Sequence, residues 1–126
     1  MLYHFPPGLL ACVSRAYARP YDDPINARAG EPVDIDPDRS AQTDLFGWVW
    51  CRAPDGREGW TPEAWLQGAG NRRTLQRDFD AIELTVAVGD RVLPLFSESG
   101  FIWCRTDDGR QGWLPDAFIT LMATEA

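Results

Sequence analysis

The feature that most constrains the fold of this chain is an internal repeat. Residues 47–66 align without a gap with residues 100–119, and eleven of the twenty aligned positions are identical. Two shorter upstream blocks also match, residues 29–33 with 88–92 and residues 13–17 with 75–79. A repeat of about fifty residues is near the lower size limit for independent folding, so the sequence predicts two similar small domains in tandem.

The repeats also define the domain boundaries. Residues 67–73 contain two glycines and an asparagine, which is the composition of a short flexible connection. The predicted organisation is an N-terminal extension at 1–10, domains at 11–67 and 74–122, a linker at 68–73 and a C-terminal tail at 123–126.

Within each repeat, aromatic and β-branched residues occur in short runs separated by turn signals, a pattern typical of an all-β domain. The dipeptides Asp55-Gly56 and Asp108-Gly109 lie between two such runs and predict hairpin turns. No amphipathic helix is evident. The predicted fold class is therefore all-β.

Strand alternation predicts which side chains of the repeat are buried. Cys51 and Cys104 fall on the inward face and are interpreted as core residues. Trp50 and Trp103 then point outward, and each lies opposite a tryptophan of the next strand, Trp60 or Trp113. So much apolar area needs a cover, and we expect packing between the domains, with a partner as the alternative.

Charge and composition exclude several functions. A net charge of −7 argues against nucleic acid or an anionic membrane as the main partner. The cations are twelve arginines and no lysine, which excludes Schiff-base chemistry. Cys12, Cys51 and Cys104 are odd in number and lack zinc-site spacing, so we expect free thiols, no metal and no cofactor. With no signal peptide or membrane span evident, the expected location is cytoplasmic.

The block from Gly47 to Leu66 and its copy, with the pattern Gly-Arg-x-Gly-Trp-x-Pro-x-Ala-aromatic, resembles the last three strands of an SH3 domain. The upstream Gly-Asp-x-Val block at 89–92 adds to the resemblance. The arrangement looks like that of small bacterial proteins with paired SH3-type domains. The resemblance implies two SH3-like β-barrels in tandem.

The resemblance also implies a peptide-binding groove in each repeat, which would take a proline-containing segment of a protein partner. The groove of the first repeat would consist of Arg15, Tyr17, Trp48, Pro62 and Trp65. That of the second would consist of Arg77, Phe79, Phe101, Pro115 and Phe118. Since the second groove lacks the tryptophan and both tyrosine hydroxyls, the first repeat is the expected binder.

Acidic residues near these grooves would select a basic residue of the peptide. They are Asp22, Asp23 and Asp44 in the first repeat and Asp80, Glu83 and Glu98 in the second. Arginine replaces the first signature tyrosine of the family in both repeats, at Arg15 and Arg77, which places a cation in one proline pocket.

Two other functions remain open at this point. In one, the grooves have lost their function and the chain is a scaffold that forms a homodimer or larger oligomer. In the other, it is an SH3-like cell-wall-binding accessory protein, which the free cysteines oppose. No catalytic residues are expected, because His4 and Cys12 lack an orienting third group and no other catalytic motif is evident.

Overall fold

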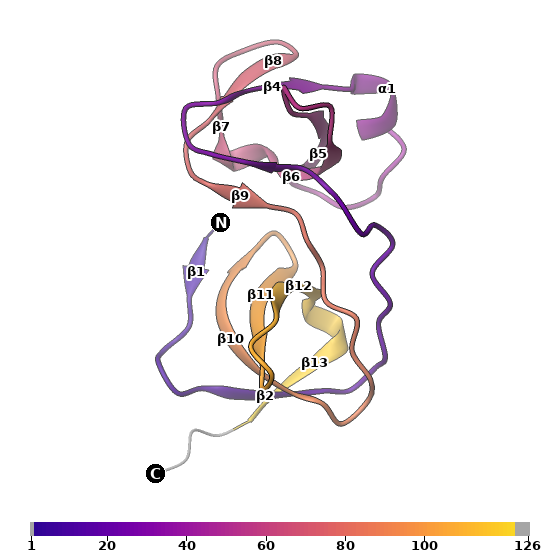
Figure 1. Ribbon diagram of the computed structural model, residues 1–126, viewed down its shortest axis with the longest axis vertical. Coiled ribbons are helices and arrows are strands. Elements are labelled where there is room, and N and C mark those ends of the chain that lie inside the picture. The colour runs from indigo at the N-terminus through magenta and orange to yellow at the C-terminus, as the bar shows by residue number, and fades with distance from the viewer. Residues whose placement is uncertain (1, 123–126) are drawn as a thin grey trace. The chain divides into compact units, whose positions relative to one another are not determined.

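The computed structural model describes residues 2–122 and is mostly β, with 46% strand and 8% helix (Figure 1). The all-β prediction is therefore confirmed. The strands pair into open sheets, and no closed barrel is found within residues 2–122.

The chain forms two compact units that do not follow the predicted domains. Unit 1 combines residues 1–22 with 82–126, and unit 2 is the continuous segment 23–81. The predicted boundary at 68–73 instead lies inside unit 2. Each unit thus contains parts of both sequence repeats.

Unit 2 is a five-stranded antiparallel sheet with short additional elements. The sheet order is β6-β5-β4-β8-β7, and β3 pairs separately with β9. The elements are β3 (Asn26–Ala27), β4 (Pro32–Ile35), α1 (Pro37–Ser40), β5 (Trp48–Arg52), β6 (Glu58–Pro62), the 3-10 helix η1 (Glu63–Trp65), β7 (Leu66–Gln67), β8 (Arg72–Leu75) and β9 (Phe79–Asp80).

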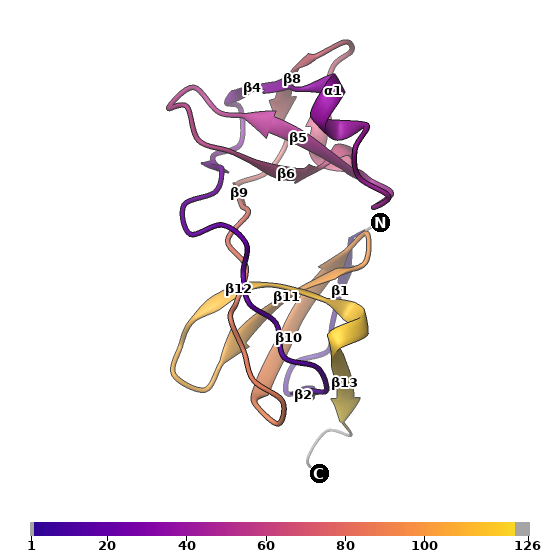
Figure 2. The same cartoon turned by 90° about the vertical axis from the view of Figure 1, so that its right-hand side faces the viewer.

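Unit 1 repeats this plan with one added strand. The sheet order is β12-β11-β10-β2-β13, and β1 pairs with β10 (Figure 2). The elements are β1 (Tyr3–His4), β2 (Leu10–Val13), β10 (Arg91–Glu98), β11 (Phe101–Thr106), β12 (Gln111–Pro115), the 3-10 helix η2 (Asp116–Phe118) and β13 (Ile119–Met122). The predicted extension at 1–10 is thus part of this unit, with Phe5 packed against its core. The predicted tail at 123–126 lies outside the described residues.

The difference from the predicted domains is an exchange of opening strands between the repeats. β2, from the first repeat, pairs with β10 and β13 of the second. β8, from the second repeat, pairs with β4 and β7 of the first. In each unit, therefore, the sheet built by one repeat is completed by the first strand of the other.

The physical reason for the exchange lies in the short connection between β7 and β8. Leu66 pairs with Leu75 and Gln67 with Thr74, so residues 68–71 of the predicted linker form a hairpin turn and its last two residues belong to β8. Gly68 and Gly70 have φ values of 112° and 74°, which a residue with a side chain rarely adopts. Since closing a short loop costs little entropy, β8 pairs with its nearest neighbour in the chain.

In each repeat, one glycine leaves room for a neighbouring segment of the chain to pass close to its backbone. A Cβ at Gly112 would lie 3.0 Å from the backbone of Ile82 and Glu83, and one at Gly59 would lie 3.0 Å from Ile25. Residues 82–84 accordingly run parallel to β12, with Trp113 N–H donating to the Ile82 carbonyl at 2.9 Å. The repeated Gly-Trp pair thus permits close backbone approach in both units.

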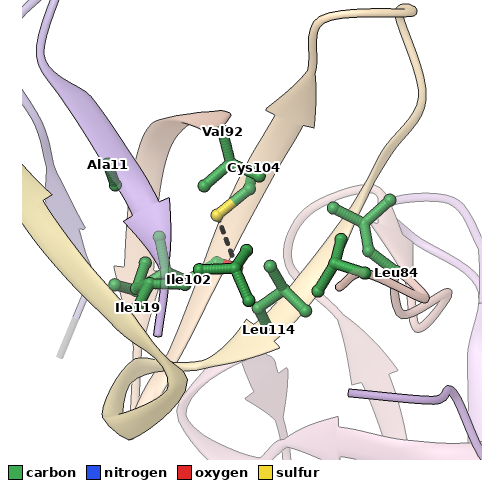
Figure 3. Close-up of a cluster of buried hydrophobic side chains, with 9 residues drawn as sticks. Ala11, Leu84, Val92, Ile102, Cys104, Leu114 and Ile119 are labelled. Carbon is green, nitrogen blue, oxygen red and sulfur yellow. Dashed lines mark hydrogen bonds between the residues drawn. The ribbon is translucent and has the colours of Figure 1, made fainter. Parts of the chain in front are cut away.

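The core of unit 1 draws on both parts of that unit (Figure 3). Ala11 of β2 lies in one cluster with Leu84, Val92, Ile102 and other apolar side chains. Cys104 belongs to it and is fully buried, as is Cys51 in unit 2. Burial raises the pKa of the Cys51 thiol to about 11 and that of Cys104 to about 12. The prediction that these thiols are buried core residues is confirmed.

The predicted hairpins and tryptophan pairs are confirmed as well. β5 pairs with β6 and β11 with β12, which places Trp50 opposite Trp60 and Trp103 opposite Trp113. The rings contact edge to face, with centroids 5.2 Å apart in the first pair and 5.4 Å in the second.

Candidate functional site

Strand exchange redistributes the predicted groove residues between the units. Arg15 and Tyr17 lie in unit 1, whereas Trp48, Pro62 and Trp65 lie in unit 2. The first predicted groove is therefore split. Arg77 and Phe79 likewise belong to unit 2, whereas Phe101, Pro115 and Phe118 belong to unit 1. Each unit nevertheless assembles a full set of equivalent positions, one part from each repeat.

Unit 1 brings together the predicted positions Arg15, Tyr17, Phe101, Pro115 and Phe118, which we call the unit 1 aromatic site. The rings of Tyr17 and Phe118 contact edge to face, with centroids 5.4 Å apart and planes at 81°. The Arg15 guanidinium carbon lies 4.8 Å from the centroid of the Phe118 ring. Phe101 and Pro115 are cross-strand partners. The three rings and the proline are all partly exposed.

The local sequence explains how these side chains are positioned. Pro115 ends β12 and precedes η2, where its fixed φ favours the turn. Phe118 ends that helix, and its carbonyl accepts the backbone N–H groups of Ser14 at 2.8 Å and Arg15 at 3.3 Å. These bonds hold the end of the exchanged first-repeat segment against η2.

A carboxylate completes the site. The Tyr17 hydroxyl donates to Glu83 Oε1 at 2.6 Å. Burial raises the pKa of Glu83, while the bond from Tyr17 opposes this shift. Burial, followed by the bond to Glu83, raises the pKa of the Tyr17 hydroxyl. The sequence grouped Glu83 with peptide-selecting acids and did not predict this bond, because its two partners come from different repeats.

Unit 2 contains the equivalent arrangement in a more buried form. Trp65 and Phe79 contact edge to face at 5.5 Å, and the Arg77 guanidinium carbon lies 5.0 Å from the Trp65 ring. Trp48 and Pro62 are cross-strand partners. Trp48, Trp65 and Phe79 are at most 6% exposed. Exposed aromatic surface at these positions is therefore a property of unit 1.

The remaining acidic candidates have different surroundings. Asp22 pairs with Arg19 at 2.9 Å in unit 1, and Asp23 pairs with Arg57 at 3.2 Å in unit 2. Asp44 is exposed in unit 2. Asp80 accepts from Asn26 at 3.4 Å, while Glu98 is 1% exposed and accepts from Ser99. A buried position is a poor place from which to select a peptide cation, so Glu98 is not a candidate for that role.

Two other kinds of feature are absent from the part of the chain that the structure describes. Within residues 2–122 no group of three or more metal-ligating side chains could hold an ion. No helix of this part is long and apolar enough to cross a membrane. The ring of His4 packs at 5.8 Å from Phe96.

Comparisons with protein-family models, with curated proteins and with solved structures gave no match for this chain.

Proposed function

We propose that this protein is a non-catalytic peptide-binding module made of two SH3-like units, and that unit 1 carries the binding surface. Both units share one strand order, and each has a 3-10 helix directly before a strand, η1 before β7 in unit 2 and η2 before β13 in unit 1. This agreement supports two copies of a single small domain type. The resemblance of both repeat blocks to SH3 domains favours an SH3-like domain as that type.

The observation that carries the function is the contact between Tyr17 and Phe118. Two partly exposed rings meeting edge to face leave apolar surface beside them, and Pro115 lies three residues from Phe118. Proline-rich segments pack against such aromatic surfaces because their extended helix is already formed before binding. A proline-containing peptide of a protein partner is therefore the ligand that this surface suits.

The proposal moves the expected binding surface. The sequence favoured the groove with Trp48 and Trp65, but these side chains are buried. The unit 1 aromatic site combines the tyrosine of the first repeat with the phenylalanines of the second. Tyr17 is thus the shared element of the prediction and the proposal.

The test is an NMR titration of the full chain with a panel of blocked proline-rich peptides. We expect signals of Tyr17 and Phe118 to shift with at best micromolar affinity, and Phe118→Ala to abolish the shifts. Phe46→Ala is the matched control, since Phe46 is 95% exposed in unit 2 and its loss should change nothing.

Thermal unfolding of Phe118→Ala would establish that the variant remains folded. If no peptide shifts either ring at millimolar concentration, the peptide-binding proposal is wrong. A particle mass that grows with protein concentration would then favour the self-associating scaffold.

A further inference from the structure

We infer that the peptide bound by unit 1 carries a carboxylate that pairs with Arg15. This inference rests on the proposed function and specifies its ligand: a proline-containing segment with an aspartate or glutamate beside the proline. Arg15 is then the residue that determines specificity.

Arg15 is held in place but its charge is open to solvent. Its backbone is fixed by the bond to the Phe118 carbonyl, and its guanidinium lies over the face of the Phe118 ring. Stacking on a ring uses the face of the guanidinium and leaves the N–H groups at its edge available. The side chain is exposed, so a ligand can reach those N–H groups.

No acidic side chain within residues 2–122 forms an ion pair with Arg15. The chain has nineteen acidic side chains and twelve arginines. Many of the other arginines do have such a partner: Arg19, Arg28, Arg52, Arg57, Arg72, Arg91 and Arg110. The guanidinium of Arg15 can therefore form an ion pair with a carboxylate of a ligand.

The same stack recurs at the equivalent position of unit 2. Arg77 lies over Trp65 and also forms no ion pair with an acidic side chain of the described residues. The two copies thus keep an arginine on the ring that ends each 3-10 helix. They differ in the ring beneath, which is buried in unit 2 and partly exposed in unit 1.

The acidic residues of unit 1 that the sequence grouped with the grooves have other surroundings. Glu83 already accepts the Tyr17 hydroxyl, Glu98 is buried, and Asp22 is paired with Arg19. Arg15, which is exposed, is thus the group of the predicted site that a ligand carboxylate can reach, while the other exposed charge nearby is Asp116 of η2. A guanidinium binds a carboxylate through two parallel N–H bonds, which also fixes the orientation of the ligand.

The experiment uses the full chain and three amidated peptides of sequence acetyl-Ala-Pro-Pro-X-Pro-Ala, where X is Glu, Gln or Arg. A fourth peptide has X as Gln and a free C-terminal carboxylate, which separates a side-chain carboxylate from a chain end. Affinities come from NMR titration of the Tyr17 and Phe118 signals. Arg15→Gln removes the positive charge. Arg15→Lys keeps the charge but lacks the two parallel N–H donors of the guanidinium. Arg77→Gln is the matched control in unit 2.

We expect the Glu peptide to bind about fivefold more tightly than the Gln peptide, the size of a favourable exposed ion pair. Arg15→Gln should abolish this preference, Arg15→Lys should weaken it and Arg77→Gln should preserve it. If the free-carboxylate peptide shows the preference instead, the ligand is a chain end and the assignment to an internal acidic residue is wrong.

Equal affinities in the wild type, a preference for the Arg peptide, or a preference that survives Arg15→Gln would each overturn the inference. In these cases the peptides still bind, so the proposed function stands. If no peptide shifts Tyr17 or Phe118, the proposed function fails and the inference fails with it.

Discussion

Units 1 and 2 contain the same cross-strand tryptophan pair but cover it with different parts of the chain. In unit 2 the cover is α1, where the Arg39 guanidinium carbon lies 3.8 Å from the Trp50 ring and Ser40 Oγ accepts the Trp50 backbone N–H. Trp50 is 4% exposed.

In unit 1 the cover is Phe96, on the long strand β10. Its ring stacks on Trp103 with centroids 6.2 Å apart and meets Trp113 edge to face at 5.5 Å. The ring of His4, in β1, packs in turn against Phe96. The sequence did not predict these contacts within each unit, and its expectation that the two domains pack over the tryptophans stays a prediction.

The comparison indicates that the repeated blocks supply the tryptophan pair of each unit, and that segments outside the aligned blocks supply the side chains that pack on it. A second difference between the units is continuity: unit 2 is one continuous segment, while unit 1 consists of the two segments that flank it in the sequence.

Strand exchange can be tested with the native Cys12 and one introduced cysteine. Cys12 of β2 is the cross-strand partner of Thr120 in β13. Partners in an antiparallel pair have Cα atoms about 4.5–5.5 Å apart, which suits a disulfide. Thr120→Cys should therefore form a disulfide with Cys12 under mild oxidation, detected by peptide mapping without reduction.

Gln67→Cys is the matched control, because residue 67 is the equivalent of Thr120 in the other repeat. If each repeat kept its own opening strand, Cys12 would lie opposite residue 67. A disulfide between Cys12 and Gln67→Cys, with none to Thr120→Cys, would show that the strands are not exchanged.

The continuity of unit 2 predicts which fragment folds alone. Residues 23–81 contain the complete five-stranded sheet, so this fragment should unfold cooperatively in urea. Residues 23–71 lack β8, which lies between β4 and β7 and contributes the buried Leu75. Loss of such a side chain alone costs about 2–5 kcal/mol, enough to unfold so small a domain.

The informative comparison is with residues 11–67, the predicted first domain. This fragment must pair β2 where β8 belongs, and we expect it to be less stable than 23–81. Equal stability of the two fragments would mean that the opening strands are interchangeable and that the hairpin at 68–71 does not decide the pairing.

The two covers should differ in energetic weight. Phe96→Ala removes a partly buried ring that contacts both tryptophans of unit 1, and we expect a loss of about 2 kcal/mol in unfolding free energy. Arg39→Ala removes an exposed cation from one ring, with an expected loss below about 1 kcal/mol. Urea unfolding of both variants followed by circular dichroism tests the order, and a larger loss for Arg39→Ala would reverse our ranking of the covers.

The outcome for the sequence predictions follows the same division. The repeated residues predicted the all-β class, both hairpins, the buried Cys51 and Cys104 and the tryptophan pairs, because strand alternation and turn chemistry are local. The exchange was not predictable from these signals. β2 and β8 are equivalent in the repeat, and the glycines at 68–71 suit a flexible linker as well as a hairpin.

The candidate site was predictable by residue type but not by grouping. Tyr17, Phe118 and Arg15 were all singled out, yet the sequence assigned Phe118 to a different groove from the other two. Grouping depends on which strands pair, and long-range pairing has no local signature. The bond between Tyr17 and Glu83 depends on the same pairing.

The smallest expected effect concerns Glu83, which has no acidic counterpart in unit 2, where Pro24 precedes the buried Ile25. Since burial raises the folded-state pKa of Glu83, the folded state binds a proton more tightly than the unfolded state. Stability therefore falls as the pH rises from the unfolded pKa of about 4.3 through the folded value, and is unaffected by Glu83 below both. Glu83→Gln retains an acceptor for Tyr17 but cannot ionise, so its stability relative to the wild type should increase across that pH range in urea unfolding.

Tyr17→Phe removes the bond that lowers the pKa of Glu83, so in this variant the carboxyl signal of Glu83 in carbon NMR should titrate at a higher pH than in the wild type. A Glu83 carboxyl that titrates at or below its ordinary pKa in the wild type would contradict the first expectation, and a Tyr17→Phe variant whose Glu83 titrates no higher than in the wild type would contradict the second.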